Sequence, residues 1–101
     1  MQTNPAATNP VVAIIAAAKA FADATESNEP VIATELQELR RREVADYCRA
    51  LAQVANHVAS LVEAGRGEFE QFGAHADSYD AAHSALRNAT EDLTAIAHQL
   101  S

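Results

Sequence analysis

Residues 72–100 decide the fold, and they read FGAHADSYDAAHSALRNATEDLTAIAHQL. Large apolar side chains recur at intervals of seven in this segment, at Phe72, Tyr79, Leu86, Leu93 and Leu100. Further apolar residues follow three positions later, at Ala82, Ala89 and Ile96. A heptad pattern sustained over this length is typical of a helix that packs against another helix. We therefore expect a C-terminal helix over about residues 68–100.

The preceding segment repeats the same pattern, and we expect a second long helix over about residues 30–64. Its apolar positions include Val44, Tyr47, Leu51, Val54, Val58 and Leu61. Gly65, Arg66 and Gly67 separate the two patterns, and glycine readily takes the left-handed conformation that ends helices. A reversal at Arg66 predicts an antiparallel hairpin with Leu51 near Ala82. The two apolar stripes are expected to mesh between its helices.

A shorter N-terminal helix is predicted over about residues 10–25. Asn9 is a suitable cap, and Pro10 fits the first helical position, where a missing N–H costs nothing. Residues 25–30, TESNEP, read as a turn, and either Pro30 or a capping box at Thr34 and Gln37 can open the second helix. Residues 1–9 lack any period and are predicted to form a flexible arm, which leaves 10–101 as a single helical domain.

The composition favours an all-α fold, either a three-helix bundle or a dimeric four-helix assembly. The chain of 101 residues holds 24 alanines but only three glycines and three prolines. Alanine is the strongest helix former, whereas glycine and proline disfavour helix interiors. Six arginines against one lysine, with so much alanine, hint at a bacterial or phage source.

The charge balance argues against nucleic acid and anionic membranes as partners. Fourteen acidic residues outweigh seven basic ones, giving a net charge of -7. Arg40, Arg41 and Arg42 form the only basic run, and they are expected to pair with acids three or four residues away on a solvated helix face. The apolar run of residues 11–22 is too short to span a bilayer and has no basic residue before it. We expect a cytoplasmic protein, or else one exported without a cleavable signal or associated with a virion.

No constellation of residues predicts catalysis or a cofactor, so we expect a protein that is not an enzyme. Cys48 lies inside an apolar helical stretch, where a cysteine usually acts as a small buried apolar residue. The serines of the hairpin, which include Ser60 and Ser78, lack the strand–turn–helix setting of an activated nucleophile.

One alternative is a helical bundle that binds a metal or small molecule. His57 and His75 lie equally far from Arg66, so a reversal there would bring them face to face. Asp80 and His83 repeat the carboxylate and histidine spacing of di-iron bundles, although carboxylates are missing from the facing helix.

The main functional prediction is a non-enzymatic module for protein–protein interaction or assembly. A short first helix covers only part of a long hairpin, which leaves apolar surface for a second copy or another helical protein. The predicted interface residues are Ile14, Phe21, Leu51, Val58, Phe72, Tyr79, Leu86 and Leu93.

The stretch AHADSYDAAHSAL, residues 74–86, resembles the small type VII secretion substrates of actinobacteria, as do the length, acidity and alanine content of the chain. This resemblance implies an exported, dimeric helical hairpin. The chain departs from that group at the turn, which lacks Trp-x-Gly, and at His83, where the tyrosine-based export pattern after Tyr79 needs an acid. An additional N-terminal helix also lies outside the pattern. A structural component of a phage or secreted assembly is therefore a further alternative.

Overall fold

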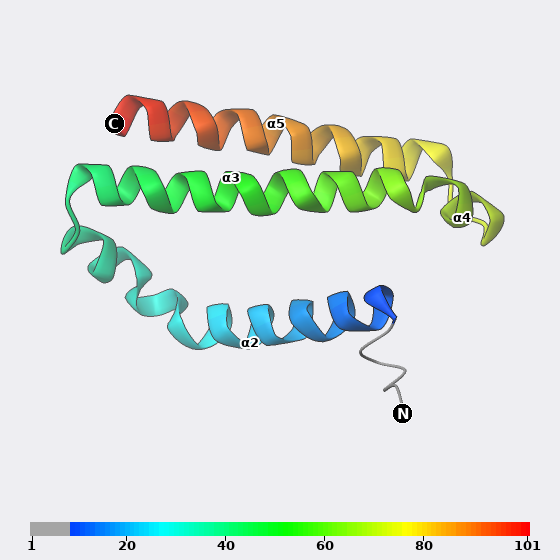
Figure 1. The fold of residues 1–101 in the computed structure, drawn as a ribbon, viewed down its shortest axis with the longest axis horizontal. Helices are drawn as coiled ribbons and strands as arrows, with labels where there is room; N and C mark the ends of the chain where they lie inside the picture. The colour runs from blue at the N-terminus through cyan, green and yellow to red at the C-terminus, as the bar shows by residue number, and fades with distance from the viewer. Residues whose placement is uncertain (1–8) are drawn as a thin grey trace, which may run out of the picture. The chain divides into compact units, whose positions relative to one another are not determined.

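The computed structural model describes residues 9–101, and helices make up nearly all of this range (Figure 1). In chain order the helices are α2 (Pro10–Gln37), α3 (Arg41–Ala64), α4 (Arg66–Gln71) and α5 (Ala76–Leu100). They form two compact units, one ending at Glu38 and the other running from Leu39 to Ser101. The predicted all-α fold is confirmed. The predicted flexible arm lies outside the described residues, except for Asn9.

Helix α2 begins where the sequence predicts. The side-chain oxygen of Asn9 accepts hydrogen bonds from the backbone N–H groups of Val11, at 2.9 Å, and Val12, at 3.4 Å. Pro10 occupies the first helical position, where it leaves no hydrogen bond unmade. The sequence signal for this helix start is therefore confirmed.

The predicted end of α2 near Thr25 is wrong, because the helix continues through Pro30 and stops at Gln37 after 28 residues. A proline inside a helix removes one backbone hydrogen bond and bends the helix, but it need not end it. The ribbon of α2 changes direction in this region (Figure 1). Thr25 and Asn28, expected in a turn, instead bond the helix carbonyls of Ala22 and Ala24.

The break between α2 and α3 falls at residues 38–40, which contain no glycine or proline. Here the backbone N–H of Arg40 donates to the Glu43 carboxylate at 2.9 Å, so a side chain satisfies a group that the helix leaves free. The predicted start of the second helix near residue 30 is therefore wrong, and α3 begins at Arg41.

Helices α3 and α5 lie side by side and antiparallel, which confirms the predicted hairpin (Figure 1). Its register differs from the prediction. A reversal at Arg66 would place Asn56 opposite residue 76. Instead, the side-chain oxygen of Asn56 accepts a 2.6 Å hydrogen bond from Arg87. The offset of 11 residues is about three helical turns.

The register differs because the chain reverses after α4, not at Gly65–Gly67. Gly73 is the glycine with a positive φ, 98°, among the described residues. The N–H of Gly73 bonds the Glu70 carbonyl, and that of Ala74 bonds the Phe69 carbonyl. These two bonds form a Schellman motif, which ends α4. The predicted helix start at residue 68 is consequently wrong, and α5 starts at Ala76.

Candidate interaction surface

Small side chains form the seam along which α3 packs on α5. On α3 they are Ala45, Cys48, Ala52 and Ala59, all buried, and Tyr79 and Ala97 are the buried residues of α5. Spacings of three, four and seven place the α3 residues on one side of the helix. Cys48 packs with Ala45 and Ala97, so its predicted role as a small buried apolar residue is confirmed. No large side chain is fully buried among residues 9–101.

The large apolar residues of α3 lie beside this seam and not in it. Tyr47, Leu51 and Val58 each precede a seam residue by one position, which rotates them by about 100° around the helix. Val54 and Leu61 follow a seam residue by two positions and lie farther around the helix from α5. Val54 is 47% exposed and Leu61 is 45% exposed. The prediction that the leucine and valine stripes mesh inside the hairpin is therefore wrong for α3, because alanine and cysteine occupy that position.

Helix α5 presents apolar residues on the same flank of the hairpin. Leu86 and Leu93 are half-buried, and Ile96 is exposed. We call the combined surface the apolar face, and its members are Tyr47, Leu51, Val54, Val58 and Leu61 of α3 with Leu86, Leu93 and Ile96 of α5. Such a surface over two neighbouring helices is typical of a site that binds another protein.

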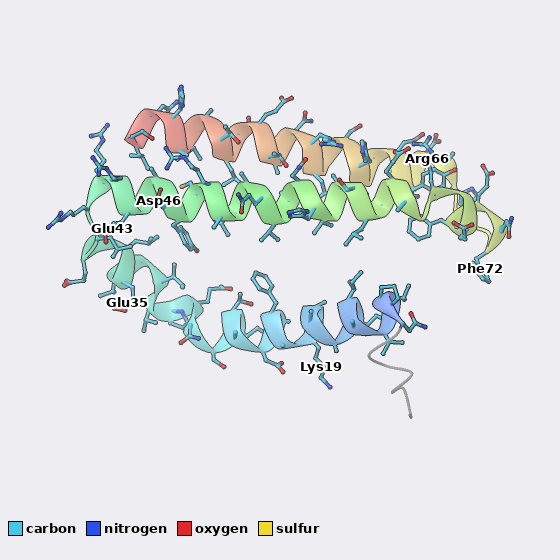
Figure 2. All side chains as sticks on the ribbon, in the orientation of Figure 1. Lys19, Glu35, Glu43, Asp46, Arg66 and Phe72 are labelled. Carbon is cyan, nitrogen blue, oxygen red and sulfur yellow. The ribbon has the colours of Figure 1, made fainter. Side chains whose placement is uncertain are left out.

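The opposite flank of the hairpin is polar. In addition to the bond between Asn56 and Arg87, Arg49 donates to the Ser101 hydroxyl at this flank. A shallow groove of about 350 Å³ runs between the helices here, lined by Arg49, Ala52, Gln53, Asn56, Thr90 and Thr94. The side chains of the hairpin are drawn in Figure 2. The hairpin thus has two chemically different flanks.

A compact network joins α4 to the start of α5. Arg66 pairs with Asp80 at 2.6 Å, and its guanidinium carbon lies 5.1 Å from the centre of the Tyr79 ring. The Tyr79 hydroxyl donates to the Glu70 carboxylate at 3.3 Å. The centres of the Phe69 and Tyr79 rings lie 6.3 Å apart. Burial raises the pKa of Tyr79, and the nearby Glu70 carboxylate raises this pKa further. These contacts fix the turn, and Phe72 projects from it with 90% of its surface exposed (Figure 2).

The predicted interface residues fall in four different settings. Ile14 and Phe21 are exposed on α2, a helix with no buried residue of its own. Leu51, Val58, Leu86 and Leu93 belong to the apolar face, and Phe72 lies at the turn. Tyr79 is 8% exposed and belongs to the core of the turn. Four exposed members of the apolar face were not among the predicted interface residues, although the apolar patterns of the sequence contain them: Tyr47, Val54, Leu61 and Ile96.

The histidines do not come together as the metal alternative requires. Because Asn56 bonds Arg87, His57 lies level with the middle of α5, about 16 Å along the helix from the level of His75. His83 approaches Glu63 at 3.8 Å, on the polar flank. Within residues 9–101, no three side chains of the kinds that bind metals are grouped. The predicted pairing of His57 with His75 is therefore wrong.

Comparison with known proteins does not place the chain in a family. No family model, no curated protein and no solved structure matches it. None of the described helices combines the length and the apolar character that crossing a membrane requires.

Proposed function

We propose that this chain is a helical protein–protein interaction or assembly module that self-associates through the apolar face of its hairpin. The observation that carries this proposal is the exposure of Tyr47, Val54, Val58, Leu61 and Ile96 along one flank. These side chains are 37–47% exposed, so covering each of them gains less than half of the roughly 1.5–3 kcal/mol that full burial of a large apolar side chain gives, and a partner that covers them is favoured.

The weakness of the hairpin core supports the same proposal. Its buried residues are alanines, one cysteine and one tyrosine, so the unit formed by residues 39–101 buries little apolar surface. Small domains with so little core usually need a disulfide, a metal or another chain. Cys48 is the sole cysteine of the sequence, so no internal disulfide can supply that stability.

The apolar face is large enough for a stable interface. Helix α3 has 24 residues and is therefore about 36 Å long. Two packed helices present a surface about 20 Å wide. Their product is about 700 Å² per copy, so a contact between two copies buries about 1,400 Å², which is within the usual range for specific complexes.

Sedimentation of the full chain at micromolar concentrations tests this proposal. We expect a dimer or higher oligomer, and we expect Val54→Asp to weaken association because it buries a charge in the interface. Gln53→Asp is the matched control, since it places the same carboxylate one residue away on the polar flank and should leave association unchanged. A wild-type chain that stays monomeric contradicts the proposal.

A further inference from the structure

Charge is distributed unevenly along the hairpin. We call residues 39–50 the open end, which contains four arginines and two acids. We call residues 63–80 the turn end, which contains five acids and one arginine. The last nine residues of the chain, which lie beside the open end, contain no Asp, Glu, Lys or Arg. One end of the hairpin is therefore basic and the other is acidic.

Several of these charges have no partner within the hairpin. At the open end, Arg40 and Arg42 make no ion pair with any residue of the unit formed by residues 39–101. The same holds for Glu68 and Asp77 at the turn end. By contrast, Arg66 is already paired with Asp80 and Glu63. Free basic groups and free acidic groups thus lie at opposite ends of the hairpin.

We infer that the apolar face is covered by a second copy of this chain in the antiparallel orientation, with the turn end of each copy beside the open end of the other. This inference rests on the proposed function and adds the identity and orientation of the partner. A two-fold axis perpendicular to the helices brings the basic open end of each copy, which contains Arg40 and Arg42, level with the acidic turn end of its partner, which contains Glu68 and Asp77. Complementary charges of this kind fix the register of an interface.

The opposite orientation is disfavoured by the same charges. If the two turn ends met, ten acidic side chains and only two arginines would gather at one end of the dimer. The two open ends would then place eight arginines together at the other. Juxtaposed like charges oppose association. The apolar face allows either orientation, and the charges select the antiparallel one.

Disulfide trapping in the full chain tests the orientation. In a Cys48→Ala background, Leu39→Cys marks the open end and Phe72→Cys marks the turn end, and both residues are exposed. Oxidation of an equal mixture should give a cross-linked pair of the two variants, and each variant alone should give little. Cross-linking of the Phe72→Cys variant with itself overturns the antiparallel orientation but leaves the proposed function intact. A wild-type chain that is monomeric in sedimentation overturns both.

Charge reversal supplies an independent test. The double variants Arg40→Glu/Arg42→Glu and Glu68→Lys/Asp77→Lys should each raise the dissociation constant of the self-association about tenfold or more, because both junctions of the dimer become repulsive. An equal mixture of the two should recover near wild-type affinity, since both junctions are then complementary. Glu91→Lys, in the middle of α5, is the control and should have little effect. Unchanged self-association of the double variants, with helical content retained by circular dichroism, overturns the inference.

Discussion

Ala59 is completely buried between α3 and α5, whereas Val58, the residue before it, leaves 38% of its surface exposed. One residue corresponds to about 100° of rotation around a helix, so the two side chains lie on adjacent strips of α3. The smaller side chain faces the partner helix of the same chain. The larger one faces outward, which is the reverse of the usual arrangement in a helical core.

Enlarging the seam should destabilise the hairpin. Ala59→Leu adds a branched side chain where no surface is exposed, and overpacking of this kind typically costs about 1–3 kcal/mol. Ala50→Leu makes the same change at an exposed position of α3 and should alter stability by less than about 0.5 kcal/mol. Urea unfolding at one fixed chain concentration measures both. Equal effects of the two substitutions would mean that Ala59 does not lie in a packed seam.

The turn should depend on Gly73 and not on Gly67. Gly73 has φ of 98°, a conformation that costs a residue with a Cβ about 1–2 kcal/mol, so Gly73→Ala should lower stability by that amount. Gly67 lies in helical α4 with open space around it, so Gly67→Ala should be neutral or stabilise by up to about 1 kcal/mol. Thermal unfolding of the two variants side by side checks this difference. A greater loss of stability in Gly67→Ala would contradict the described reversal after α4.

Tyr79 should make the stability depend on pH in the alkaline range. Its pKa is raised above the ordinary value of 10.0, so the folded chain keeps the hydroxyl proton at pH values where the unfolded chain has begun to lose it. The unfolded state then binds fewer protons, and the free energy of unfolding falls as the pH rises from about 10. Tyr79→Phe should remove this dependence and the delayed phase of the tyrosinate absorbance titration. If Tyr79→Phe reduced the amplitude of the absorbance titration but left its shape unchanged, the result would argue against a buried Tyr79.

The start of α3 should depend on Glu43. Its carboxylate accepts the Arg40 N–H at 2.9 Å, and the loss of a comparable helix cap costs about 1 kcal/mol. Glu43→Ala should therefore increase amide hydrogen exchange in the first turn of α3. Glu91→Ala, at an exposed position of α5, is the control and should leave that exchange unchanged. Equal exchange in both variants would show that the helix start does not need this contact.

The sequence was sufficient to predict the structure where one local interaction determines it. The Asn9 side chain caps α2, and the Pro10 ring fits its first position, so these two residues set the start of the helix. The heptad spacing indicated two long paired helices. Pro30 misled the prediction because a proline disfavours a helix interior without forbidding it. The break at Glu38–Arg40 carried no glycine or proline, and Glu43 was its only signal.

The register and the contents of the seam could not be read from periodicity. On α3, Ala45, Cys48, Ala52 and Ala59 have the same spacing as the larger residues one position earlier. Periodicity identifies both strips, and it does not tell which one faces α5. The usual preference for burying large residues selected the wrong strip. The register then followed from the turn, where Gly73 and not Gly65 adopts the left-handed conformation.

The two flanks of the hairpin differ in how much they determine its geometry. Alanine side chains are small and make a nearly smooth seam. They determine how closely α3 approaches α5, but they do little to determine the axial position of one helix along the other. Polar contacts between the two helices, such as the bonds of Arg87 to Asn56 and of Arg49 to Ser101, instead specify this axial position from the polar flank. Residues such as Val54 and Ile96, on the other flank, are free to change without disturbing it. Substitutions on that flank should therefore leave the backbone geometry of the hairpin unaltered.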